Sequence, residues 1–141
     1  IGIGTALIGL AELSGTLLTA FLSDRIGLKR AVTAGVIFST LVYGAVPFTG
    51  ETLFSALALL FFVFLFFEYF LVSFLSLCTE LLPENRATMM SLFFLSAGAG
   101  RMAGAFCGGL LWNAAGIDAV CLFSASSGIC ALFSLAWITK E

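Results

Sequence analysis

Long apolar runs fill most of the chain, and short polar segments separate them. The runs cover residues 1–22, 31–48, 52–77, 87–111 and 117–138. Each has about the length at which an α-helix crosses a hydrocarbon core of ~30 Å. None shows the alternation of a barrel strand, and a backbone in lipid must satisfy its own hydrogen bonds. The pattern therefore predicts five transmembrane helices, and the short connections predict that neighbouring helices run antiparallel.

The composition agrees with an all-α integral membrane protein. Of the 141 residues, 61% are hydrophobic and only 10% are charged, too few charges to cover a water-soluble surface. The lipid bilayer is the expected partner, whereas six scattered Lys and Arg offer no basic face to nucleic acid. The four cysteines show no CxxC pair, so we expect them to act as small apolar residues within helices rather than as metal ligands. No cofactor is expected.

The basic residues predict the orientation of the helices. They follow the first, third and fifth predicted helices: Arg25, Lys29, Arg30, Arg86 and Lys140. The other two connections hold only Glu51 and Asp118. Under the positive-inside rule the basic ends are cytoplasmic. We expect a multi-pass protein of the plasma or inner membrane, with an outer N-terminus and a cytoplasmic C-terminus.

The first cytoplasmic turn, DRIGLKR, gathers four charges within seven residues. Asp24 ends its helix, where the helix dipole disfavours a carboxylate by up to ~1 kcal/mol, so Arg25, Arg86 or a helix N-terminus is expected to compensate it. The turn resembles the cytoplasmic gating signature of the major facilitator superfamily, although Ala20 stands where that signature begins with Gly. The matching positions are Asp24, Arg25, Gly27, Lys29 and Arg30. A basic turn that only fixes topology is the alternative.

A second stretch, ELLPENRATMMSL at residues 80–92, resembles the second cytoplasmic loop of a six-helix half in the same family. The positions that carry this likeness are Glu80, Pro83, Glu84 and Arg86. The resemblance is closest to proton-coupled drug and sugar efflux permeases, and it implies helices 8 to 12 of a C-terminal half. Because the chain begins without Met inside an apolar run, we expect residues 1–141 to be one incomplete transmembrane domain. The missing N-terminal half and one further helix are then its partners.

Such halves contain inverted repeats, and the chain shows a matching internal similarity. A shift of 89 residues aligns Gly9 with Gly98, Gly15 with Gly104, Asp24 with Asn113 and Gly27 with Gly116. The first predicted helix runs inward and the fourth runs outward. The aligned outer loop also lacks the basic residues of the inner one. We therefore expect inverted-repeat character.

Three ionisable residues lie deep within the predicted spans: Glu12, Glu68 and Arg101. A rise of 1.5 Å per residue places them ~18 to 22 Å from the cytoplasmic end, so they share one depth. Charges at that depth are expensive and usually mark a path for substrate or protons. The alternative is a static interhelical tie between Arg101 and one of the carboxylates, or a protonated Glu that only hydrogen-bonds.

The fourth predicted helix is rich in glycine at Gly98, Gly100, Gly104, Gly108 and Gly109. Small residues at such intervals favour close helix packing, and they also resemble the glycine-rich stretch of antiporters in the same family. The Phe-rich segment 61–70 is interpreted as a lipid-facing or packing surface rather than an aromatic drug pocket.

Together these features predict a secondary transporter that exports a small solute, in exchange for protons, by alternating access. The alternative is a membrane interaction protein that transports nothing and uses the glycine-rich helix as an oligomer face. An enzyme is not expected, because the chain has no His, no HExxH and no GxSxG. The sequence does not identify the solute.

Overall fold

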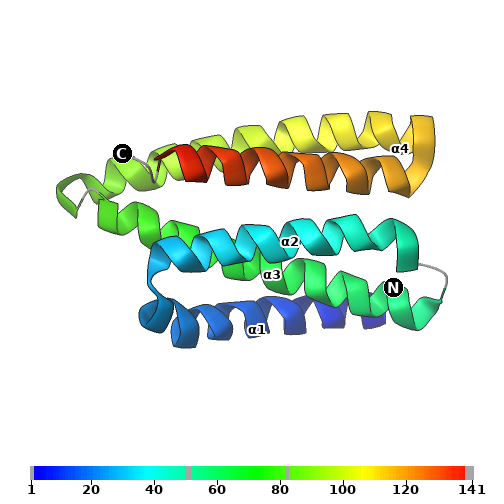
Figure 1. The fold of residues 1–141 in the computed structure, drawn as a ribbon, viewed down its shortest axis with the longest axis horizontal. Helices are drawn as coiled ribbons and strands as arrows, with labels where there is room; N and C mark the ends of the chain where they lie inside the picture. Colours follow the sequence, from blue (N-terminus) through cyan, green and yellow to red (C-terminus); the bar gives the residue numbers. More distant parts are fainter. Residues whose placement is uncertain (1, 50–51, 82, 139–141) are drawn as a thin grey trace.

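The computed structural model describes residues 2–49, 52–81 and 83–138, and these residues contain helices and no strand. The elements are α1 (Gly2–Ile26), α2 (Leu28–Thr49), α3 (Leu53–Leu81), the 3-10 turn η1 (Pro83–Asn85) and α4 (Arg86–Ile138). Figure 1 shows them as long, roughly parallel rods. Thr52 and Ser55 begin α3 with reciprocal hydrogen bonds of 3.2 Å between backbone amides and hydroxyls, an arrangement similar to a capping box.

α4 is one assigned element that doubles back on itself. Its helical geometry is broken at Ala115 (φ −147°, ψ 15°) and Gly116 (φ 73°, ψ −160°). In Figure 1 the chain reverses at this break, and residues 117–138 return beside residues 86–114. Five separate helices were predicted and four are assigned in the described residues, because the expected connection at 112–116 shrinks to two non-helical residues.

The other helices extend beyond their apolar runs. α1 continues four residues past the predicted end at residue 22, so Asp24 and Arg25 belong to its last turn. α2 begins at Leu28, directly after Gly27. Polar residues near the membrane boundary thus continue the helices, and only one non-helical residue separates α1 from α2.

The connections fall into two groups at opposite ends of the bundle. The turn at Gly27, η1 and the end of α4 lie at the left end in Figure 1. The beginning of α1, the end of α2, the beginning of α3 and the break in α4 lie at the right end. The described basic residues of the turns are therefore gathered at one end: Arg25, Lys29, Arg30 and Arg86. Glu51 and Lys140, which also entered the orientation argument, lie outside the described residues.

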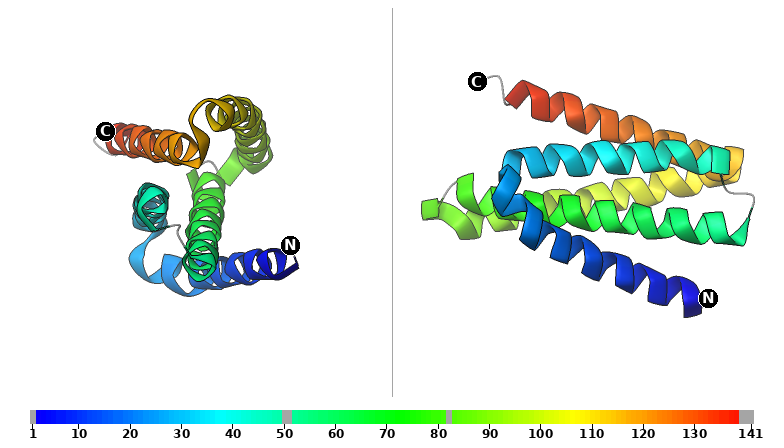
Figure 2. Two further views of the ribbon diagram at one scale, coloured as in Figure 1. Left: turned by 90° about the vertical axis from the view of Figure 1, so that its right-hand side faces the viewer. Right: turned by 60° about the horizontal axis from the view of Figure 1, so that its bottom comes forward.

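α3 lies at the centre of the bundle and contacts α1, α2 and α4. The end-on view in Figure 2 shows α1 on one side of α3 and the two parts of α4 on another. Two glycines allow neighbouring helices to approach α3 closely. A Cβ atom on Gly15 would lie 2.7 Å from the backbone oxygen of Leu65, and one on Gly35 would lie 2.9 Å from Cβ of Phe70. Gly128 likewise lets the returning part of α4 contact Thr40 of α2.

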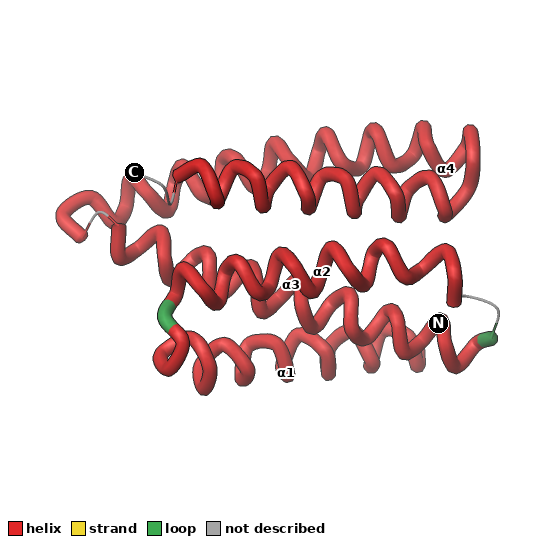
Figure 3. Tube along the Cα trace, in the orientation of Figure 1, coloured by secondary structure: helices red, strands yellow, loops and turns green. Residues whose placement is uncertain are grey.

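Most large apolar side chains point outward, which is the reverse of a water-soluble protein. The buried apolar side chains are few, and they include Ala31, Val32 and Tyr69. Exposed ones cover all four helices, for example Phe21, Phe38, Phe54 and Phe133. Helices, coloured red in Figure 3, make up almost the whole described chain. Four of them are long and apolar enough to cross a membrane. An apolar exterior of this kind suits contact with lipid.

Candidate functional site

Gly27 forms the whole connection between α1 and α2. Its φ of 86° lies in the left-handed region, where a Cβ atom is disfavoured. Its amide donates a 3.0 Å hydrogen bond to the carbonyl of Ser23, and its carbonyl accepts one of 3.0 Å from the amide of Ala31. A single glycine therefore ends one helix and begins the next. A Cβ atom would meet no neighbouring atom, so the requirement is conformational.

The charges of this turn flank Gly27 on both helices. Arg25 lies in the last turn of α1, where a cation is favoured by the helix dipole. Lys29 and Arg30 lie in the first turn of α2, where the dipole disfavours cations. All three side chains are exposed. Asp24 lies in the last turn of α1, and its side chain is outside the described part of the structure.

The second predicted loop lies at the same end of the bundle. Glu80 falls in the last turn of α3, Pro83 and Glu84 form part of η1, and Arg86 begins α4. These four residues are all exposed. Neither acid forms an ion pair with a described side chain. The two charged turns thus share one end of the molecule without a described salt bridge between them.

Glu12 and Glu68 come together in the middle of the membrane-spanning segments. Glu12 is near the centre of the α1 span, Gly2–Ser23, and Glu68 near the centre of the α3 span, Leu53–Leu81. They meet because Gly15 brings α1 against α3: a Cβ atom there would lie 2.9 Å from Cβ of Glu68. Glu12 acts on the Glu68 carboxyl group through charge repulsion, and the Thr16 hydroxyl donates a 2.9 Å hydrogen bond to the backbone carbonyl of Glu12. The structure therefore places two acids beside each other at mid-depth.

Buried hydroxyl groups continue along the same interface toward the Gly27 end. Thr19 donates a 3.0 Å hydrogen bond to the carbonyl of Gly15 and lies 3.4 Å from that of Tyr69. One turn further, the hydroxyls of Ser23 and Ser73 are 3.2 Å apart. The hydroxyl of Tyr69 is buried and has no hydrogen-bond partner among the described residues. Sequence reasoning missed this cluster, although hydroxyl residues recur on α1 at intervals of three and four.

Arg101 lies on another face, away from the two acids. It is exposed and lines a groove of about 400 Å³ between α3 and the first part of α4. Phe67 and Phe70 also line this groove, so part of the Phe-rich segment borders a cavity. Among the described residues Arg101 forms no ion pair with Glu12 or Glu68. The permanent ion pair between helices that was considered as the alternative for Arg101 is therefore not formed in this structure.

The glycines of α4 do not pack against the rest of the described chain. A Cβ atom on any of them would meet no atom within 4 Å: Gly98, Gly100, Gly104, Gly108 and Gly109. The internal alignment pairs Gly104 with Gly15 and Gly98 with Gly9. Gly15 is tightly packed against α3, whereas a Cβ atom on Gly9 would meet no atom within 4 Å. These positions thus have open space around them within the described chain, and Gly100 borders the groove beside Arg101.

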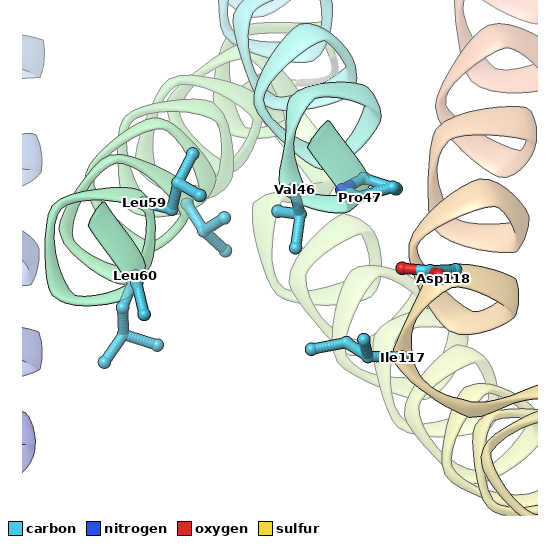
Figure 4. Close-up of a pocket in the computed structure, with 8 residues that line it drawn as sticks. Val46, Pro47, Leu59, Leu60, Ile117 and Asp118 are labelled. Carbon is cyan, nitrogen blue, oxygen red and sulfur yellow. The ribbon is translucent and has the colours of Figure 1, made fainter. Parts of the chain in front are cut away.

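A second cavity, of about 420 Å³, opens at the other end of the bundle. Figure 4 shows Pro47 of α2, Leu60 of α3 and Ile117 of α4 around it, with Asp118 at its edge. Asp118 follows the break in α4, so it sits in the first turn of the returning segment, where the dipole favours an acid. This placement explains the carboxylate without a ligand.

The described residues also define the scope for metal binding among them and the state of the cysteines. The described residues contain no group of three His, Cys, Asp or Glu side chains that is arranged to hold a metal ion. All four cysteines are free thiols: Cys78, Cys107, Cys121 and Cys130.

Comparison with known proteins identifies the family. Searches of the curated proteins and of the solved structures gave no significant match. The profile of the Major Facilitator Superfamily matches residues 1–141, the full length of the chain. This match agrees with the long apolar helices. The chain therefore belongs to the Major Facilitator Superfamily, a family of membrane transporters.

Proposed function

We propose that this chain forms part of a secondary transporter that exports a small solute in exchange for protons. The observation that carries the proposal is the close packing of α1 on α3 at Gly15 and Glu68, which brings Glu12 and Glu68 within electrostatic reach of each other at mid-depth. Like charges repel strongly where water is scarce, so a proton bound by this pair lowers the repulsion between the carboxylates. Protonation and release at Glu68 would then change the packing of α1 against α3.

The turn around Gly27 is proposed as the gate that follows this change. α1 runs without interruption from Glu12 to Asp24 and Arg25, so a tilt of α1 at mid-depth moves the charged turn. Asp24 lies at the helix end that disfavours a carboxylate, so its charge needs a compensating partner. In the proposed cycle Asp24 binds this partner in one transport state and releases it in the other. The turn faces the cytoplasm in this proposal, with the beginning of α1 outside.

The wider architecture is proposed to follow the drug and sugar efflux branch. The five segments 2–26, 28–49, 53–81, 86–114 and 117–138 would be helices 8 to 12 of a C-terminal half, facing an N-terminal half across the solute path. Inverted-repeat character is supported by the two hairpin glycines, since Gly27 (φ 86°) and Gly116 (φ 73°) are aligned and both have positive φ.

Exchange can be measured in proteoliposomes that contain the intact protein and trapped pyranine, a pH indicator. A panel of anionic, neutral and cationic amphipathic solutes is added, and proton movement is recorded for each. We expect Glu68→Gln to abolish solute-driven proton movement while the protein still inserts. Asp24→Asn should slow exchange without abolishing it. Asp118→Asn is the matched control and should leave exchange unchanged, because Asp118 is an exposed acid at the start of the returning part of α4, away from Glu68 and the Gly27 turn.

Two results would contradict the proposal. If Glu68→Gln retains full solute-driven proton movement, this carboxylate does not carry protons. If no solute moves protons in the wild type and the protein instead forms stable oligomers, the alternative of a non-transporting interaction protein is favoured.

A further inference from the structure

The groove between α3 and α4 combines aromatic walls with a deep cation. Phe67, Phe70 and Phe74 of α3 line it together with Phe93 and Arg101 of α4. Its volume of about 400 Å³ is within the usual range for sites that hold small organic ligands. The groove lies on α3 and the first part of α4, whereas Glu68 faces Gly15 of α1.

The aromatic contacts fix how the two helices are aligned along the groove. The ring centroids of Phe74 and Phe93 are 5.8 Å apart, so these residues share one level. Arg101 is eight residues further along α4, or ~12 Å, and Phe67 is seven residues back along α3, or ~10 Å. Because the two segments run antiparallel (Figure 1), Arg101 and Phe67 lie near the same level. The groove thus has an aromatic end and a cationic end ~10 to 12 Å apart.

The charge of Arg101 is not neutralised within the described chain. No acidic side chain lines the groove, and Arg101 forms no ion pair with a described residue. A guanidinium group at this depth is strongly favoured by an anionic partner, which it can bind through two parallel hydrogen bonds. Aromatic rings stack well on the Phe walls. An occupant of this groove therefore needs one anionic head and an aromatic body.

We propose that the groove binds an aromatic organic anion, with its carboxylate or sulfonate at Arg101 and its ring between Phe70 and Phe93. This inference rests on the proposed function, because the anion is taken to be the exported solute. A lipid headgroup is disfavoured as the source of the anion. Arg101 is fifteen residues from Arg86 at the cytoplasmic end, or ~22 Å, whereas headgroups lie at the membrane surface.

Binding can be tested with three probes of equal length on the intact protein in phosphatidylcholine nanodiscs. The probes are 6-phenylhexanesulfonate, 6-phenylhexanol and 6-phenylhexyltrimethylammonium, which carry a negative, zero and positive charge. We expect the sulfonate to bind at least ~10-fold more tightly than either of the others, since hydrogen bonds between charged groups are worth more than neutral ones. Equal or tighter binding of the cation would overturn the proposal.

Substitutions locate the site. Arg101→Gln should weaken sulfonate binding by ~10- to 100-fold and leave binding of the alcohol unchanged. Arg101→Lys keeps the charge but loses the paired hydrogen bonds, so we expect a smaller loss of sulfonate affinity than in Arg101→Gln. Arg101→Lys also replaces Arg101→Gln as the test if the latter does not fold. Phe70→Leu should weaken all three probes, because Phe70 lines the part of the groove proposed for the ring. Phe62→Leu is its matched control, because Phe62 is exposed on the same helix and does not line the groove.

The outcomes separate this inference from the proposed function. Unchanged sulfonate binding in Arg101→Gln, or displacement of the sulfonate by added phosphatidylglycerol, would overturn the inference. If another solute still drives proton movement that depends on Glu68, the proposed function survives that result. Sulfonate binding that depends on Arg101, in a protein that exchanges no solute for protons, would instead retain the binding site and overturn the transport proposal.

Discussion

Individual residues at the first turn are poorly placed for helix stability. Asp24 lies at the negative end of α1, and Lys29 and Arg30 lie at the positive end of α2. Each placement costs roughly 0.3 to 1 kcal/mol when the side chain is exposed. Local helix stability therefore does not explain these three charges. In the proposed orientation the two cations hold the turn on the cytoplasmic side. For the acid we expect compensation by Arg25, Arg86 or a helix N-terminus.

Gly27 is the residue whose requirement is easiest to isolate. We expect Gly27→Ala to lower the free energy of unfolding by about 1 to 2 kcal/mol, because alanine is disfavoured at φ of 86°. Unfolding by sodium dodecyl sulfate in mixed micelles measures this change. Gly44→Ala is the matched control, since Gly44 lies inside α2 and its Cβ would also meet open space. A loss equal to that of the control would show that the turn does not need glycine.

At the scale of the elements, the apolar runs predicted the helices because hydropathy and length are local properties. The same reasoning did not predict how short the connection inside α4 is, because the reversal depends on the backbone angles of only two residues, Ala115 and Gly116. Counting residues along the helices placed Glu12 and Glu68 at one depth. It did not show that these two meet while Arg101 lies in a separate groove, because facing depends on how the helices are rotated.

The contact between α1 and α3 depends on the absence of a side chain at Gly15. A methyl group there would lie 2.7 Å from the Leu65 backbone oxygen, so Gly15→Ala must push the helices apart. We expect this change to lower the free energy of unfolding by about 1 to 3 kcal/mol. It should also weaken solute-driven proton movement, because Glu12 and Glu68 separate. Thermal unfolding and the pyranine assay measure the two effects.

Gly9→Ala is the control for this contact, because Gly9 is on the same helix and its Cβ would meet no atom within 4 Å. It should keep proton movement intact and leave stability unchanged or raise it slightly, since alanine is the better helix former. Equal effects of the two substitutions would show that the close approach of α1 to α3 is not important.

For the whole molecule, the arrangement of the turns leads to a labelling prediction. Glu84 and Thr52 lie at opposite ends of the bundle, on η1 and just before α3. In a variant without the native cysteines, we expect Glu84→Cys to react with an impermeant maleimide only from the cytoplasmic side. Thr52→Cys should react only from outside. The reverse pattern would invert the proposed orientation.

The internal alignment also predicts how this chain meets the rest of a transporter. Gly15 packs against α3, while its aligned partner Gly104 meets no described residue. If the repeats are related by symmetry, Gly104 receives a helix that is outside this chain, in the way that Gly15 receives α3. Gly104→Leu should then abolish transport by the intact protein. The stability of residues 1–141 expressed alone should not change, because the new side chain would point into open space.

Ala105→Leu provides the matched comparison, since Ala105 is the exposed neighbour of Gly104 on α4 and belongs to another face of the helix. Transport by this variant should be less affected, because the added bulk is rotated by ~100° from the Gly104 side of α4. A disulfide scan from Gly104→Cys would identify the helix that it meets. Cross-links within one protein molecule support the symmetric partner, because the contact then forms inside the transporter. Cross-links only between two copies would instead show that the glycine-rich face joins protomers, and the symmetric packing would be wrong.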